Sequence, residues 1–219
     1  MKIISFSLWG NKPIYNHGFV RNYLDAKKVY PDWDVVLYYD DTIDDFVKDF
    51  ITDNSIEAYN MTGSKIPGEF WRFLANDLTD VTHVIFRDCD SRLSLREKLA
   101  VDEWIKSEKT LHVMRDHPYH RIPLGVSEMG ILAGMWGLRT GKMNMTERLN
   151  DLVVNKFLKW GSDQTFTFEI YKEFLNDKIT HDEFFGGLKF PIPRTDKHFV
   201  GERIDENNQR VGEDYKMIP

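Results

Sequence analysis

The sequence has a single cysteine, Cys89, among 219 residues, so it cannot form an internal disulfide framework and suits a reducing compartment. It also lacks any apolar stretch of the roughly 20 residues that a membrane-spanning helix needs. Residues 1–10 contain too short an apolar run for a signal peptide. A formal charge of -6 leaves no basic stripe for a nucleic-acid partner. We therefore expect a cytoplasmic protein without a membrane span.

The residues that are present can build one sizeable core. Apolar residues make up 42% of the chain and aromatic residues 14%, which favours a single domain over residues 1–219, whether complete or cut from a longer chain. Short apolar runs predict strands, and the segments between them carry apolar residues at helical spacing. The predicted strands span 2–8, 34–39, 82–87 and 111–114, and the predicted helices 19–30 and 69–78. This alternation predicts an α/β fold with a mostly parallel sheet covered on both faces.

Helices in the second half are predicted from their first residues. Ser94 and Glu97 have the spacing of a capping box, in which each side chain satisfies a backbone N–H at the helix start. Thr146 is predicted to cap a helix that runs to residue 158. Ser162 or Asp163 is predicted to cap another that runs to residue 175.

An acidic triplet, Asp88-Cys89-Asp90, follows the third predicted strand. Ligands of open α/β sheets bind beyond the carboxyl ends of the strands, so the triplet stands at a predicted binding edge. Two carboxylates at this spacing suit Mg²⁺ or Mn²⁺, which share their remaining positions with water and phosphate oxygens. The alternative is a solvated turn, because this short pattern is common by chance.

Two further segments contain candidate catalytic or ligand-binding residues. Residues 114–120 place Arg115 and Asp116 beside two histidines; Asp116 could act as a general base and Arg115 could bind phosphate or sugar. The alternative is a polar loop bonded to itself. Residues 130–137 are rich in glycine without a dinucleotide-binding pattern, so Gly134 is expected to let backbone approach a sugar, or else to lie in a buried strand.

Five blocks in this order carry a resemblance to a known class of enzyme: 70–73, 84–92, 134–137, 160–164 and 198–201. Together they resemble the glycosyltransferases of the GT-A type. The chain is similar to the small transferases of large DNA viruses of algae, which glycosylate the major capsid protein, and more loosely to the glycogenin-like retaining transferases.

The resemblance implies a nucleotide-diphosphate sugar as donor, with the nucleotide held at the end of the first strand. It assigns these donor contacts to Ser5, Phe6, Trp9, Gly10, Arg72, Asp88, Gly134 and Gly201. It further implies Mn²⁺ or Mg²⁺ bound by Asp88, Asp90 and His198. The sequence after Gly201 departs from the glycogenin-like pattern, and Arg203 stands near the position of a lysine in that pattern.

The expected activity is transfer of a hexose or deoxyhexose to a hydroxyl of a glycan acceptor, which a viral source would place on a capsid glycoprotein in the host cytoplasm. The resemblance favours UDP over GDP and retention of configuration, with Asp163 and Gln164 at the reacting carbon. Asp116 as a base would instead invert it. The alternatives are a haloacid-dehalogenase-type phosphatase and a non-catalytic carbohydrate-binding module.

Overall fold

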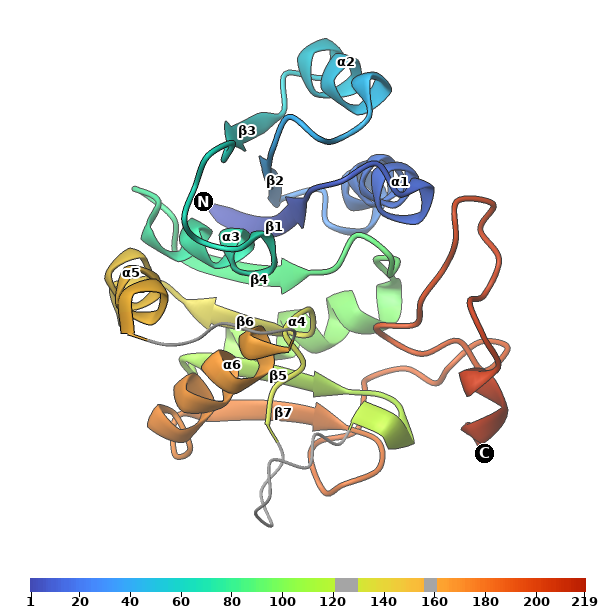
Figure 1. Cartoon of the computed structure of the whole chain (residues 1–219). Coiled ribbons are helices and arrows are strands. Elements are labelled where there is room, and N and C mark those ends of the chain that lie inside the picture. Colours follow the sequence, from blue (N-terminus) through green and yellow to red (C-terminus); the bar gives the residue numbers. More distant parts are fainter. Residues whose placement is uncertain (121–129, 156–160) are drawn as a thin grey trace.

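The computed structural model describes residues 1–120, 130–155 and 161–219. Its centre is a seven-stranded sheet in the order β3-β2-β1-β4-β6-β5-β7 (Figure 1). The strands are β1 Lys2–Leu8, β2 Asp34–Tyr39, β3 Glu57–Asn60, β4 His83–Arg87, β5 Leu111–Arg115, β6 Trp136–Arg139 and β7 Lys178–Asp182. Strand β6 runs antiparallel to both of its neighbours, whereas the other pairs are parallel. The predicted α/β class with a mostly parallel sheet is confirmed.

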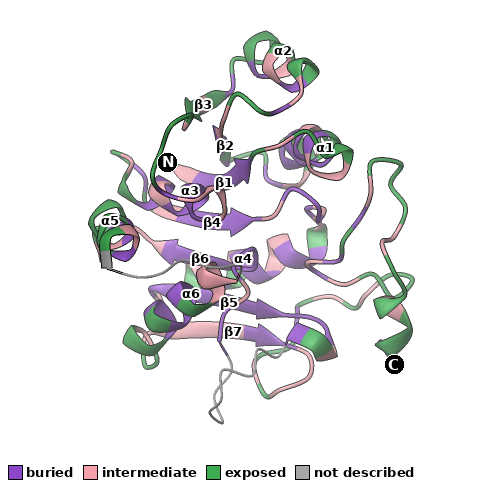
Figure 2. Ribbon diagram, in the orientation of Figure 1, coloured by how far each residue is buried: buried purple, intermediate pink, exposed green. Residues whose placement is uncertain are grey.

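Helices cover both faces of this sheet (Figure 1). They are α1 Pro13–Val29, α2 Asp45–Asp53, α3 Gly68–Trp71, α4 Leu95–Ser107, α5 Met145–Asn155 and α6 Ser162–Glu173, with 3-10 turns η1 Arg72–Asp77, η2 Pro118–His120 and η3 Asp214–Met217. Side chains alternate along a strand between its two faces, so Ile3 packs under η1, α5 and α6 while Ile4 packs under α1 and α4. Both cores are buried, and the exposed residues lie on the outer sides of the helices, in β3 and in the loops (Figure 2).

The prediction of one continuous helix over 69–78 is wrong. In the structure this segment splits at Arg72 into the short helix α3 and the 3-10 turn η1. Two serines of β1 hold the backbone at this point. The Ser5 hydroxyl donates to the carbonyl of Arg72 across 2.7 Å, and the Arg72 N–H donates to the Ser7 hydroxyl across 2.8 Å. These hydrogen bonds fix Arg72 at the carboxyl end of the sheet.

The capping box predicted at α4 is half formed. The Ser94 hydroxyl accepts from the Glu97 N–H, as expected. The carboxylate of Glu97, however, is fully buried and accepts from Arg87 and Tyr30 instead of from the Ser94 backbone. A buried guanidinium gives this carboxylate a stronger partner than an N–H at an exposed helix end.

The helix predicted after Thr146 begins one residue earlier, so Thr146 is not its cap. Asn144 accepts from the Glu147 N–H, and Asp77 accepts from the N–H groups of Met145 and Thr146. The predicted end at residue 158 lies outside the described residues. In the ranges that the structure describes, no helix is both long and apolar enough to cross a bilayer.

Candidate active site

Arg72 joins two carboxylates at the carboxyl end of the sheet. Its guanidinium donates to Asp88, which follows β4, and lies 3.8 Å from the Asp163 carboxylate in the first turn of α6. The arginine side chain is only 6% exposed, whereas that of Asp88 is 45% exposed. Arg72 therefore acts as a buried support that leaves Asp88 accessible.

Gly134 provides the space that Asp88 occupies. A Cβ built at position 134 would lie 1.9 Å from Oδ2 of Asp88, so a side chain there would displace the carboxylate. Gly134 was predicted to admit a sugar. In the structure the space beside Gly134 holds a carboxylate of the acidic triplet, and the sugar contact stays a prediction.

Asp90 points to the other side of the triplet, toward α1 and the C-terminal segment. Its Oδ2 accepts from Nε of Arg203 across 2.8 Å, and the hydroxyl of Tyr15 in α1 interacts with the same arginine. Burial raises the pKa of the Asp90 carboxyl, and the negative charge of Asp88 raises it further. Sequence reasoning missed Tyr15, because a tyrosine in the first turn of a helix carries no distinctive signal.

The charges of this group fit a divalent cation. Three carboxylates, those of Asp88, Asp90 and Asp163, face two guanidinium groups, those of Arg72 and Arg203. The five side chains therefore carry a net charge of about -1, with Arg72 shared between two carboxylates, and carboxylate oxygens are the donors that Mg²⁺ and Mn²⁺ prefer. Asp88 and Asp90 are the two side chains suited to hold such an ion.

The start of α6 presents the predicted catalytic pair. Gly161 has φ of +82° before the helix, and the Asp163 carboxylate accepts from the Gln164 N–H. Burial raises the pKa of the Asp163 carboxyl. Oε1 of Gln164 is buried and accepts no hydrogen bond from any described residue. Trp160, part of the resembling block, lies outside the described residues.

The residues predicted to hold the nucleotide differ in exposure. Ser5 and Phe6 are completely buried within β1, so their side chains lie beneath the edge of the sheet. Trp9 is 44% exposed, and its ring packs edge-on against Trp71 over Gly68. Of these four residues, Trp9 and the neighbouring Gly10 are therefore the ones that a nucleotide could contact at the surface.

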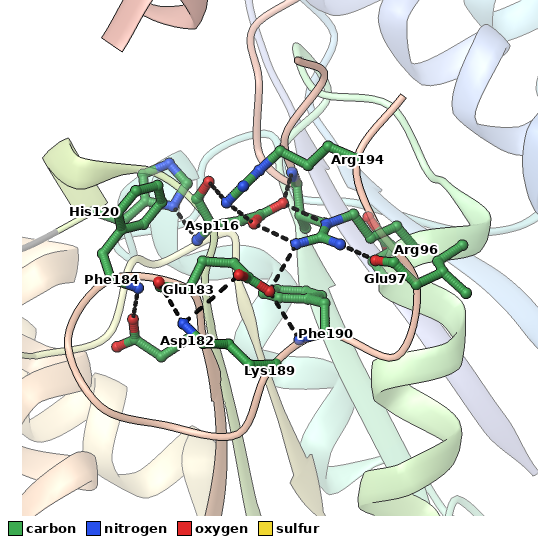
Figure 3. Close-up of polar contacts among 12 residues, drawn as sticks. Arg96, Glu97, Asp116, His120, Asp182, Glu183, Phe184, Lys189, Phe190 and Arg194 are labelled. Carbon is green, nitrogen blue, oxygen red and sulfur yellow. Dashed lines mark hydrogen bonds and ion pairs between the residues drawn. The ribbon is translucent and has the colours of Figure 1, made fainter. Parts of the chain in front are cut away.

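Asp116 lies in a buried ion network instead of at an open surface. Figure 3 shows Arg96 and Arg194 converging on its carboxylate, with Arg96 bound through Nε and Nη2 at 2.9 and 2.8 Å. Arg194 binds the same carboxylate at 2.5 Å, and the Val200 N–H donates to it at 2.9 Å. The side chain has no exposed surface, which argues against the predicted general base.

Residues 192–208, here called the C-terminal strap, run beside the acidic triplet. The Ile204 N–H donates to the Asp90 carbonyl across 2.7 Å, and Gly201, with φ of +84°, packs on Met135. His198 is exposed and contacts Glu202 within the strap. Among the described residues, no three His, Cys, Asp or Glu side chains form a group that could hold a metal ion. The structure thus does not bring His198 to Asp88 and Asp90, as the predicted ligand set requires.

No family model and no curated protein matches the chain by sequence. Solved structures do match its fold. The galactosyltransferase LgtC, in complex with donor and acceptor sugar analogues, superposes with a TM-score of 0.52 at 13% identity over 83% of this chain and 73% of its own. The fold is the GT-A fold.

Two other structures agree with this assignment. Staphylococcus aureus TarS 1-349 in complex with UDP-GlcNAc gives a TM-score of 0.54 at 16% identity over 100% of this chain and 62% of its own. The glycosyltransferase GlyE of Streptococcus pneumoniae gives 0.52 at 14% identity over 82% of this chain and 44% of its own. At these identities the similarity establishes the GT-A fold and leaves donor and acceptor open.

Proposed function

We propose that the protein is a metal-dependent glycosyltransferase that moves a hexose or deoxyhexose from a UDP-sugar to a hydroxyl of a glycan acceptor. The observation that carries the proposal is the meeting of Asp88, Arg72 and Asp163 at the carboxyl end of a GT-A sheet. That edge is where ligands bind in open α/β sheets. Among the structurally similar proteins, LgtC is a galactosyltransferase and TarS binds UDP-GlcNAc.

Asp88 and Asp90 would hold Mn²⁺ or Mg²⁺ together with the donor diphosphate. The bound ion would neutralise negative charge that grows on the diphosphate as the sugar leaves. Arg203, on the strap, would move from Asp90 to a phosphate oxygen, for which a guanidinium is well suited. Trp9 and Gly10 would border the nucleotide.

Asp163 and Gln164 would face the sugar. Arg72 fixes Asp163, and the unsatisfied Oε1 of Gln164 gives a sugar hydroxyl an acceptor. LgtC has been crystallised as an active-site mutant in which a glutamine is replaced by glutamate, so a glutamine belongs to the active site of that neighbour. The sequence resemblance adds a capsid glycoprotein as the proposed acceptor, in host cytoplasm.

The experiment is thermal unfolding with UDP-GlcNAc, UDP-glucose, UDP-galactose and GDP-mannose, each with Mn²⁺ or with EDTA. A ligand that binds only the folded protein raises the midpoint as its concentration rises, because it adds about 2.7 kcal/mol to the free energy of unfolding at a hundred times its Kd. We expect a rise for a UDP-sugar with Mn²⁺ and none in Asp90→Asn. Asp32→Asn, which removes an exposed carboxylate paired with Lys2, is the matched control.

Turnover separates the remaining functions. Release of UDP with transfer to a glycan supports a transferase, whereas donor binding without release would show a carbohydrate-binding module. Release of phosphate from sugar phosphates would show a phosphatase. Phosphatases of that type usually carry the triplet after the first strand, whereas here it follows β4.

A further inference from the structure

A second cavity lies behind the acidic triplet. It has a volume of about 530 Å³, within the range of small-molecule pockets, and lies between α1, the start of α4 and the C-terminal strap. Arg21, Asp25, Arg92 and Ser94 line it on the helix side, and Phe199 lines it from the strap. The proposed donor site includes none of these residues.

The strap forms the wall between this cavity and Asp90. Glu202 and Ile204 line the cavity, whereas Arg203 between them reaches Asp90 on the other side. The alternation is that of an extended segment, in which successive side chains point to opposite faces. The cavity and the donor site are therefore separate spaces that share one wall.

Arg92 brings a positive charge to this cavity that no carboxylate in the described parts of the chain balances through an ion pair. Its terminal nitrogens donate only to backbone carbonyls, those of Cys89, Ser91, Ile204 and Asp205. Its Nε is buried and has no hydrogen-bond partner among the described residues. By contrast, Arg21 pairs with Asp25 at 3.1 Å, and Arg96 pairs with Asp116.

The start of α4 adds to this positive field. The helix has 13 residues and begins after Ser94, which lines the cavity, and a helix N-terminus favours a negative group. Ile192, Pro193 and Phe199 give the opposite wall an apolar surface. The lining thus combines a guanidinium that forms no ion pair with any described residue, although Asp25 and Glu202 also line the cavity, with a surface on which a carbon ring can pack.

We propose that this cavity binds an acidic or phosphorylated sugar, whose carboxylate or phosphate lies beside Arg92 and the start of α4 and whose ring packs on the apolar wall. The proposal does not depend on glycosyl transfer, since the cavity lies outside the donor site.

The test is calorimetric titration of the full chain without nucleotide or divalent metal, using glucuronate, glucose 6-phosphate, inorganic phosphate and glucose. We expect the acidic sugar or the sugar phosphate to bind, and glucose at the same concentration not to bind. Arg21→Gln removes a cation that lines the cavity, so its affinity should fall about two- to fivefold, whereas Asp25→Asn should raise affinity by a similar factor. Arg148→Gln is the matched control, because Arg148 is a surface arginine that pairs with Glu173 on α6.

Four results would overturn the proposal. One is the absence of binding by both acidic ligands, and another is binding of glucose as tight as that of glucuronate. The third is equal affinity in Arg21→Gln and Arg148→Gln, which would place the ligand elsewhere. Binding of inorganic phosphate as tight as that of glucose 6-phosphate would overturn the assignment of a sugar. None of these results bears on donor binding, so the proposed function is judged separately.

Discussion

Arg203 donates from Nε to Oδ2 of Asp90 across 2.8 Å, although the two residues are 113 positions apart in the chain. The guanidinium thereby contacts an oxygen that a divalent ion would need. An arginine side chain 55% exposed at the edge of the site can leave without disturbing the core. If Asp90 holds the proposed metal ion, the guanidinium of Arg203 would compete with that ion for the carboxylate.

This competition gives opposite effects of one substitution on metal and donor. In Arg203→Gln we expect Mn²⁺ to bind about two- to fivefold more tightly, because a positive charge beside Asp90 is lost. UDP-GlcNAc should bind more weakly in the presence of Mn²⁺, because the diphosphate loses a guanidinium partner. Mn²⁺ titration by electron paramagnetic resonance and calorimetry with the nucleotide sugar measure the two effects. Arg203→Lys, which keeps the charge, should shift Mn²⁺ affinity least; unchanged Mn²⁺ affinity in Arg203→Gln would contradict the competition.

Asp116→Asn should unfold more easily without a specific loss of turnover. The substitution leaves the buried guanidinium of Arg96 without its main counter-charge, and breaking a buried pair in this way costs about 3–5 kcal/mol. Urea denaturation gives the change in the free energy of unfolding, and turnover is compared per folded molecule at low temperature. Asp32→Asn, at an exposed pair, should cost about 1 kcal/mol or less. Normal stability together with abolished turnover would restore Asp116 as a catalytic base.

Stability should fall as the pH drops from 7 to 5. Burial lowers the pKa of His120 to about 3 and that of His83 to about 4, and it also lowers the pKa of His112 and His181. Such a histidine stays neutral in the folded protein at a pH where the unfolded chain binds a proton, so acid favours unfolding below about pH 6.5. Each fully coupled proton contributes a slope of up to about 1.4 kcal/mol per pH unit.

Urea denaturation at several pH values measures this slope. In His120→Asn the amide oxygen can replace Nδ1 as the acceptor for the Asp116 N–H, so the slope should decrease by up to one proton. A free energy of unfolding that is constant from pH 7 to 5 would contradict the prediction.

The sequence predicted the central strands because β1, β2, β4 and β5 are buried on both faces and form continuous apolar runs. The two edge strands, β3 and β7, were not predicted. β3 and β7 have polar sequences, Glu-Ala-Tyr-Asn and Lys-Ile-Thr-His-Asp, because an edge strand buries little and tolerates charge. Their place in the sheet is fixed by pairing with β2 and β5, which no local pattern records.

The candidate site was also predicted only in part, because local patterns reveal some of its residues and long-range contacts decide the others. Asp88 and Asp163 carry recognisable local signals, at a strand end and at a helix start. The partners of Asp116, in contrast, come from Arg96, Arg194 and Val200, which are 20 to 84 positions away. From the sequence alone, a polar loop residue that is free for catalysis therefore cannot be distinguished from one that long-range contacts bury.

The stereochemical outcome follows from which groups remain near the acceptor. Asp116 is held by Arg96, Arg194 and Val200, so it offers no base for in-line displacement. In the proposed reaction, if no other carboxylate takes the proton of the acceptor hydroxyl, that proton would pass to the leaving diphosphate, and attack would occur on the face that the diphosphate vacates. We therefore expect retention of the anomeric configuration, measured by proton NMR of the newly formed linkage. Gln164→Ala should lower kcat by roughly 100-fold, because it removes the polar group that we propose contacts the sugar, with no change in the free energy of unfolding beyond about 1 kcal/mol. An inverted product, formed at the normal rate by Gln164→Ala, would show that a different carboxylate reaches the acceptor.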